Sequence, residues 1–194
     1  NTSTGFRIMA FGSPQWMYTS GADFTLDQSL RFDDGSTPYL NWTPSGAGNR
    51  KTWTFSAWIK RNNLGVGGVI FGAVGDNSRM RFSTDRIQWE FNNTQTWRLV
   101  TTQKFRDPSA WFHLLINVDT TQGTAANRMS MYINGVKVTA FDNEDYPTLN
   151  GEGGVNNNSL QSIGRDATNS DNYLDAYLAE VHFIDGTALT PTSF

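Results

Sequence analysis

The chain has 194 residues, and it contains no cysteine, few charged residues and no long hydrophobic run. Without cysteine it forms no disulfide, binds no zinc through thiolates and has no thiol nucleophile. No apolar stretch approaches the roughly 18–20 residues of a membrane-spanning helix. Lys and Arg are scattered and the formal net charge is −3, which disfavours nucleic-acid binding. A chain of this length can still bury one full hydrophobic core.

The clearest local signal is a β-hairpin over residues 128–140. Asn134-Gly135 is a favoured two-residue turn, because both residues tolerate the positive φ angles of a type I′ turn. This turn pairs apolar residues on one face: Ile133 with Val136, Met131 with Val138, and Met129 with Ala140. The turn and the period-2 pattern therefore predict the same register.

Other segments also alternate apolar and polar residues, which indicates half-buried strands. In residues 52–60, Trp53, Phe55, Ala57 and Ile59 face one way. Further strands are predicted at 29–32, 39–42, 69–71, 80–82, 87–91, 97–101, 111–119 and 177–184. Roughly ten short strands without helical periodicity predict an all-β sandwich or jelly roll. We expect residues 1–24 to be a lead-in arm or edge segment, residues 25–194 to be the domain, and residues 141–162 to be a long loop region.

Six segments carry a family resemblance, and they are Ser29–Asp33, Trp53–Lys60, Trp111–Asp119, Met131–Val136, Ile163–Arg165 and Tyr177–Phe183. In this order they resemble the laminin-G-like domains of the concanavalin A-like lectin/glucanase superfamily. The resemblance covers about residues 28–190 and implies a jelly-roll sandwich of two antiparallel sheets, used mostly to bind sugars or proteins. The closing residues 183–194 are similar to lectin-like domains of structural proteins from marine tailed phages.

Several aromatic residues are candidates for carbohydrate binding. Trp42, Trp97 and Tyr146 lie next to polar or turn residues, and Trp58 lies on the polar face of its strand. Sugar rings stack on exposed aromatic rings while neighbouring polar groups bind the hydroxyls. We therefore expect these four residues to contribute to a sugar-binding surface. The alternative is that they pack under loops or against a neighbouring subunit.

The densest acidic cluster is Asp142-Asn143-Glu144-Asp145, directly after the hairpin. Oxygen ligands in a loop suit Ca²⁺, and the resemblance implies the same ion, because many members of the superfamily bind calcium at the rim of a sheet. We expect Asp142, Asn143 and Asp145 as ligands, with Asp76 from a second loop. The ordinary alternative is an exposed polar turn.

The glutamates argue against an enzyme. Glycosidases that share this fold resemble one another in an E-x-D-x-x-E strand, which places the two reacting carboxyl groups on one face. None of the glutamates has that spacing: Glu90, Glu144, Glu152 and Glu180. Glu180 and His182 could form an acid/base pair on one strand, but a solvated pair is the simpler interpretation.

Together these observations predict a non-enzymatic binding or assembly module on a phage virion. It would be a tail-fibre adhesin contacting host glycans, or a capsid-decorating protein contacting other virion proteins. The alternatives are a free extracellular lectin and, less favoured, a glucanase-like glycoside hydrolase. The chain starts at Asn1 without Met, so we expect it to be cut from a longer protein. The aromatic residues of the first 24 positions predict a homo-oligomer, with a trimer as the first expectation by analogy with phage fibres.

Overall fold

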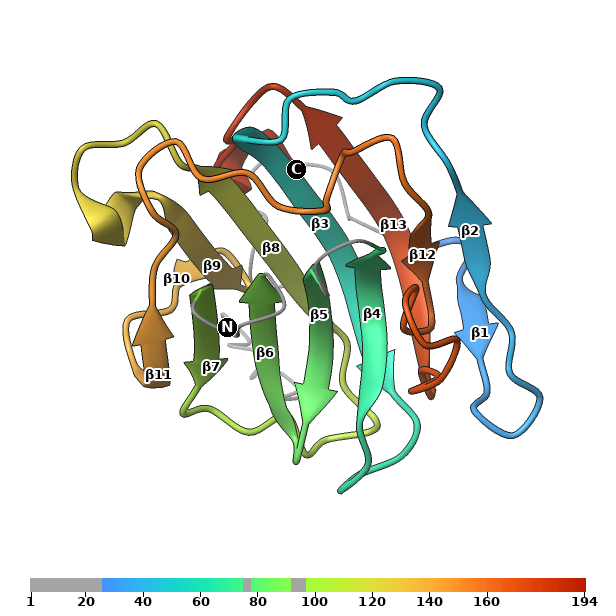
Figure 1. The fold of residues 1–194 in the computed structure, drawn as a ribbon. Coiled ribbons are helices and arrows are strands. Elements are labelled where there is room, and N and C mark those ends of the chain that lie inside the picture. Colours follow the sequence, from blue (N-terminus) through green and yellow to red (C-terminus); the bar gives the residue numbers. More distant parts are fainter. Residues whose placement is uncertain (1–25, 75–77, 92–96) are drawn as a thin grey trace, which may run out of the picture.

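The computed structural model describes residues 26–74, 78–91 and 97–194, which form two antiparallel sheets packed face to face (Figure 1). The six-stranded sheet has the order β1 (Leu30–Phe32), β13 (Ala176–Asp185), β3 (Thr52–Arg61), β8 (Phe112–Asp119), β9 (Met129–Ile133) and β10 (Val136–Lys137). The seven-stranded sheet has the order β11 (Phe141–Asp145), β7 (Trp97–Thr101), β6 (Arg86–Phe91), β5 (Ser78–Ser83), β4 (Gly68–Ala73), β12 (Gln161–Ile163) and β2 (Leu40–Trp42). The predicted all-β sandwich is confirmed.

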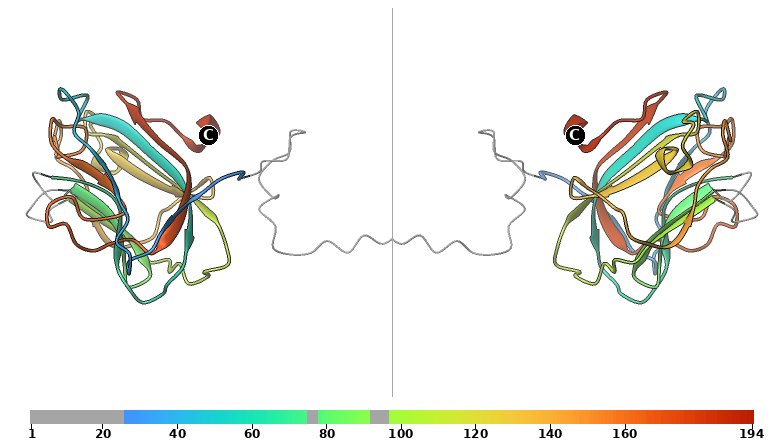
Figure 2. Two further views of the ribbon diagram at one scale, coloured as in Figure 1. Left: turned by 90° about the vertical axis from the view of Figure 1, so that its right-hand side faces the viewer. Right: turned by 90° about the vertical axis from the view of Figure 1, so that its left-hand side faces the viewer.

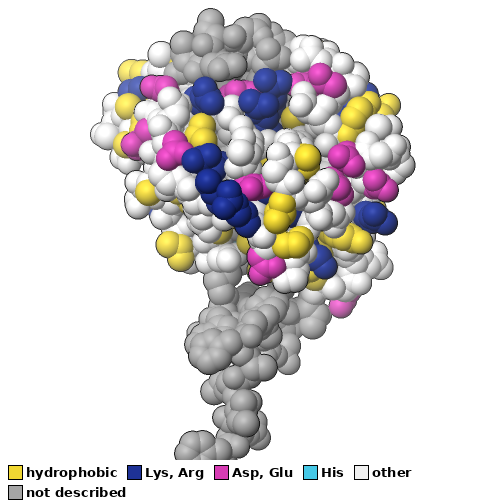
Figure 3. Space-filling model, turned by 90° about the horizontal axis from the view of Figure 1, so that it is seen from below, with side chains coloured by type: hydrophobic (Ala, Val, Ile, Leu, Met, Phe, Trp, Pro, Cys, Tyr) yellow, Lys and Arg dark blue, Asp and Glu magenta, His cyan; other side chains and the backbone are white. Residues whose placement is uncertain are grey.

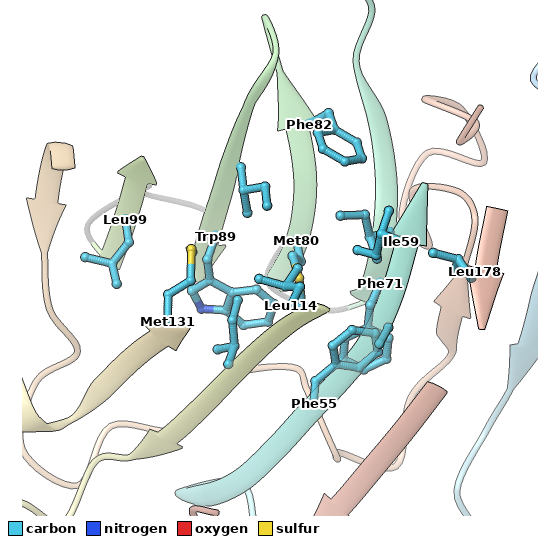
Figure 4. Close-up of a cluster of buried hydrophobic side chains, with 14 of the residues drawn as sticks. Phe55, Ile59, Phe71, Met80, Phe82, Trp89, Leu99, Leu114, Met131 and Leu178 are labelled. Atoms are coloured by element: carbon cyan, nitrogen blue, oxygen red, sulfur yellow. The ribbon is translucent and has the colours of Figure 1, made fainter. Parts of the chain in front are cut away.

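The hydrophobic core lies between the two sheets and follows the predicted alternation (Figure 4). Along β3, every second side chain from Trp53 to Ile59 is at most 1% exposed and points toward the seven-stranded sheet. Phe55 stacks on Phe71 of β4 with ring centroids 5.1 Å apart. Trp53 contacts Trp89 of β6 at 5.4 Å. Burying each of these large side chains stabilises the folded state by about 1.5–3 kcal/mol, and their summed contribution holds the two sheets together.

The hairpin turn is confirmed, but the hairpin is shorter than predicted. Asn134 and Gly135 have φ angles of 50° and 78°, and Val136 pairs with Ile133. β10 ends at Lys137, because the chain then crosses to the other sheet as β11. The predicted pairing of Met129 with Ala140 is therefore wrong, and Ala140 instead accepts a hydrogen bond from Thr102 at 3.2 Å. Val136, which was predicted on the apolar face of the hairpin, is 70% exposed, since β10 is the edge strand of its sheet.

The segment 141–162 is not one long loop. It begins with β11, which pairs with β7 through Phe141 opposite Thr101 and Asp145 opposite Arg98. Its last residues begin β12, which joins β4 to β2. β11 is an edge strand, and its charged side chains suit that position because they discourage pairing with another chain.

After β13 the chain folds back over the outer face of the six-stranded sheet, and Figure 2 shows the C-terminus on that side. The hydroxyl of Thr54 donates to the carbonyl of Thr187 and accepts from the amide of Leu189, both at 2.8 Å. Asn117 donates to the Leu189 carbonyl at 2.6 Å. Leu115, which points to this outer face, is fully buried. Within the described part of the chain, no helix is long and apolar enough to cross a membrane.

The predicted division into residues 1–24 and 25–194 stays a prediction, because residues 1–25 lie outside the described residues.

Candidate functional site

The outer face of the seven-stranded sheet is polar and rich in arginine. Strand register places Arg79, Glu90 and Arg98 in one row across β5, β6 and β7, with Asp145 of β11 at its end. The next row contains Arg81, Gln88, Val100 and Asn143. These side chains alternate with core residues such as Met80 and Leu99, so they point away from the core. We call this surface, together with Arg86 of β6, the arginine face.

Two buried carboxylates fix one guanidinium of the arginine face. Glu90 is 1% exposed and Asp166 is 2% exposed, and Arg79 forms ion pairs with both. Gln88 adds a hydrogen bond from its amide nitrogen to Glu90 at 2.6 Å. Burial opposes the charge of Arg79, but the hydrogen bonds and charges of the two carboxylates outweigh it and raise the pKa of Arg79. Arg79 is therefore a fixed cation beneath the surface.

Arg81 stands in a different electrostatic setting. Its Nε atom lies 3.5 Å from a Glu90 oxygen. Burial lowers the pKa of Arg81, and the attraction of Glu90 is offset by the like charges of Arg79 and Arg98. Arg81 thus lies close enough to the guanidinium groups of Arg79 and Arg98 to be repelled by both.

A hollow of about 290 Å³ lies on the arginine face next to the β5–β6 turn, and its lining residues are Ser83, Thr84, Arg86, Gln88, Arg98, Val100, Asp142 and Asn143. Every lining side chain except Val100 can form hydrogen bonds. Arg86 pairs with Asp142 at 2.7 Å, and Arg98 donates to Gln88 at 3.4 Å. The Oδ1 atom of Asn143 has no hydrogen-bond partner within the described part of the chain. Figure 3, seen from the end that carries this turn, shows charged side chains of both signs gathered on the surface.

The aromatic residues predicted to bind sugar are not brought together. Trp42 lies on edge strand β2, is 39% exposed and stacks on Phe71 at 6.1 Å. Trp58 lies on the outer face of the other sheet, 5.3 Å from the His113 ring. Trp97 is 8% exposed and belongs to the core, because it points the same way along β7 as the buried Leu99. Its ring is therefore not exposed as predicted, and its role in sugar binding stays a prediction.

Tyr146 follows β11 and packs partly against the core. Its hydroxyl donates to Glu144 at 2.6 Å. Burial, together with that hydrogen bond and the charge of Glu144, raises the pKa of Tyr146 to about 12. Tyr146 lies three residues after Asn143, which lines the hollow.

The predicted calcium ligands do not fit a calcium site. Asp142, Asn143 and Asp145 belong to a paired strand and not to a loop. Asp142 is paired with Arg86, and Asn143 donates to Asp145 at 3.0 Å. Asp76 lies outside the described residues. In the ranges that the structure describes, no three or more acidic, histidine or cysteine side chains are grouped to hold a metal ion.

The two histidines lie on the outer face of the six-stranded sheet. The hydroxyl of Ser56 and Nε2 of His113 are 2.7 Å apart, but Ser56 is fully buried. Burial lowers the pKa of His113, and His182 adds to the effect. His182 lies 3.6 Å from Glu180, with both side chains about half exposed, and the Phe194 ring contacts both histidines. The Ser56 hydroxyl is buried and therefore out of reach of a substrate, so the Ser56–His113 pair is structural.

The arginine face was not predicted from the sequence, although the residue pattern contains a signal for it. The alternation that marks β5 and β6 as strands also gathers Arg79, Arg81, Gln88 and Glu90 on their second face. A strand face on which several arginines gather is a candidate binding surface, because charges of one sign concentrated on a surface attract ligands of the opposite sign. The contribution of Asp166 has no local signal, because it lies 87 positions after Arg79.

Comparisons with known proteins identify the fold family. Residues 34–193 match the family described as the concanavalin A-like lectin/glucanases superfamily. No curated protein matches the sequence. Among solved structures, the native SAP-like pentraxin of Limulus polyphemus aligns with a TM-score of 0.58 and 17% identity, over 84% of this chain and 77% of the pentraxin.

Two other solved structures have saccharides in their descriptions. The binding domain of botulinum neurotoxin DC in complex with SialylT aligns with a TM-score of 0.56 and 13% identity, over 85% of this chain and 40% of that one. Domain 4 of AbnA, an extracellular GH43 arabinanase of Geobacillus stearothermophilus, in complex with arabinotriose, aligns with a TM-score of 0.51 and 20% identity, over 74% and 65%. At these identities the likeness shows the fold. The family match over most of the chain shows that this protein belongs to the concanavalin A-like lectin/glucanase superfamily.

Proposed function

We propose that this chain is a non-catalytic module that binds saccharides through the arginine face. One observation carries the proposal: the hollow beside the β5–β6 turn is lined by seven hydrogen-bonding side chains and one apolar side chain. Sugar hydroxyls both donate and accept, and they are held by such groups at fixed positions. Two proteins of similar fold are described in complex with saccharides, which supports this class of ligand.

The carboxylates favour binding over hydrolysis. A glycosidase needs two carboxyl groups on either side of the scissile bond. Asp142 is the one carboxylate among the residues that line the hollow, and it is paired with Arg86. Glu90 and Asp166 are held by Arg79 and almost inaccessible. Neither is free to protonate a leaving group or attack a sugar.

We further propose that the module acts on a phage virion, either as a tail-fibre adhesin contacting host glycans or as a capsid-decorating protein. The support is the sequence resemblance of residues 183–194 to marine phage proteins. The aromatic residues of positions 1–24 support a homo-oligomer, with a trimer as the first arrangement to test. The alternative location is outside the cell as a free lectin. Labelling purified phage particles with gold-conjugated antibodies would test whether the module lies on the virion. Sedimentation of the chain with and without residues 1–24 would test whether it forms a homo-oligomer.

The binding proposal is tested with a glycan array followed by calorimetry on the best ligand. Asn143→Ala removes a lining group and should weaken binding about tenfold, the effect of losing one hydrogen bond worth about 1.4 kcal/mol. Trp58→Ala, on the opposite sheet, is the control and should bind normally. Circular dichroism would verify that both variants are folded.

Two results would contradict the proposal. If Trp58→Ala abolished binding while Asn143→Ala did not, the site would lie on the six-stranded sheet. If reducing sugar were released from a bound polysaccharide, the module would be an enzyme.

A further inference from the structure

Three guanidinium groups lie at or beside the hollow of the arginine face. Arg86 and Arg98 line the hollow, and Arg81 lies on β5 opposite Gln88, which also lines it. Each guanidinium carries five N–H donors and no acceptor. Among the carboxylates of this face, Glu90 and Asp166 are buried against Arg79, and Asp142 is paired with Arg86. A ligand that carries an anionic group beside its hydroxyls would complement these guanidinium groups.

The positions of the charges point the same way. Arg79 and Arg81 lie on β5, and Arg98 lies on β7 with β6 between them, on one face where like charges repel at short range. Asp145 stands opposite Arg98 at the rim, where it also accepts a hydrogen bond from Asn143. Glu90 shares its single charge between Arg79 and Arg81. An anionic group placed over Gln88, between Arg81 and Arg98, would be attracted by both guanidinium groups.

The donors on this face are also held in fixed positions. Glu90 and Asp166 form ion pairs with Arg79. Gln88 is 1% exposed and donates a hydrogen bond to Glu90, and Arg98 donates one to Gln88. A preorganised guanidinium loses little entropy when it binds. Its planar fork matches two oxygens of one carboxylate or sulfate group.

We infer that the saccharide bound by this face is anionic, with its carboxylate or sulfate group held by Arg98 and by the neighbouring Arg81 or Arg86. This inference rests on the proposed function, because it names the class of ligand for the same hollow. Carboxylated and sulfated saccharides share the chemistry that the arginines recognise. The experiment below separates the two.

The test compares pairs of oligosaccharides that share one sugar backbone and differ in their anionic groups. Oligogalacturonate is compared with its methyl ester, and sulfated carrageenan oligosaccharides with the same oligosaccharides after desulfation. We expect the charged member of one pair to bind at least tenfold more tightly than the neutral member, and the charged pair that binds identifies carboxylate or sulfate. Added salt should weaken binding of the charged member, since exposed charges are screened.

Three arginine variants locate the site. Arg98→Gln should weaken binding of the charged oligosaccharide about tenfold or more and leave that of the neutral one unchanged. Arg98→Lys keeps the charge but loses the planar fork, so it should fall between Arg98→Gln and the native chain. Arg31→Gln is the matched control, because Arg31 lies on β1 of the other sheet with a side chain 60% exposed. Circular dichroism would show that each variant is folded.

Each remaining outcome decides against the inference in a distinguishable way. Equal binding of charged and neutral oligosaccharides, with Asn143→Ala still weakening both, would overturn the anionic class and keep the saccharide function. Equal loss in Arg98→Gln and Arg31→Gln would show non-specific charge attraction and overturn the site. No binding of any of the four probes would overturn the inference, and a glycan array without any ligand would then overturn the proposed function as well.

Discussion

Asp85 links several loops at one end of the sandwich, and replacing it with Asn should destabilise the fold strongly. Its carboxylate accepts hydrogen bonds from Arg61 at 2.8 Å, from the Gly65 amide at 2.7 Å and from Arg106 at 3.0 Å. Arg61 is the last residue of β3 and also donates to the Phe105 carbonyl at 2.8 Å. This network therefore ties β3, the β5–β6 turn and the β7–β8 connection together.

The expected loss follows from burial and charge. The side chains of Arg61 and Asp85 are 2% and 7% exposed. Removing one partner of a buried ion pair costs about 3–5 kcal/mol, because the other charge stays buried without compensation. Asn keeps an acceptor for Gly65 and tolerates the φ angle of 68° at this position, so we expect the low end, about 3 kcal/mol. The melting temperature should fall by about 6–12 °C at roughly 2–4 °C per kcal/mol.

The pH dependence gives a second, independent readout. The Gly65 amide and the Arg61 guanidinium, followed by Arg106, hold the pKa of Asp85 well below its usual range. A carboxyl group with a lowered pKa in the folded state stabilises the fold above its unfolded pKa, which is about 3.9, and loses that contribution as the pH falls through the folded value. The difference in stability between the native chain and Asp85→Asn should therefore be full at neutral pH and shrink below about pH 4.

Urea denaturation followed by circular dichroism, at neutral and acidic pH, measures both quantities. Asp33→Asn is the matched control. Asp33 lies 3.7 Å from Arg31 in an exposed ion pair, and such a pair contributes about 1 kcal/mol or less. Arg61→Met combined with Asp85→Asn should be more stable than Asp85→Asn alone, since no buried charge is left unpaired. A loss below about 1 kcal/mol in Asp85→Asn, or a difference that does not change with pH, would refute the reasoning.

Three further results are expected. Gly135→Val should cost about 1 kcal/mol or more in thermal denaturation, because a β-branched residue resists the φ of 78°, and an unchanged melting temperature would contradict the turn assignment. Gly164→Ala should cost more than about 2 kcal/mol, since its Cβ would lie 2.4 Å from Phe32 at a φ of 87°; a loss similar to that of an exposed glycine would disprove the close contact. Millimolar calcium should leave the melting temperature at its value in EDTA, because Asp142 is committed to Arg86, and a rise of several degrees would restore the acidic strand as a calcium site.

The sequence by itself determined the fold class, much of the core and one turn. Alternation along residues 52–60 identified Trp53, Phe55, Ala57 and Ile59 as core, and all four are buried. Asn134-Gly135 specified its turn through local backbone preference, which needs no distant partner. These features are local or periodic, so the residue pattern alone carries them.

Only the tertiary structure decided which faces and strands meet. The acidic stretch 142–145 carries turn-forming residues, yet it is a strand because the β7 edge supplies hydrogen-bond partners. Trp97 resembles an exposed sugar-binding ring in sequence, but the phase of β7 places it in the core. The arginine face forms because register aligns Arg79, Glu90 and Arg98 and the chain returns Asp166 to them. Alternation shows which residues share a face of one strand, whereas long-range pairing decides which neighbours complete that face.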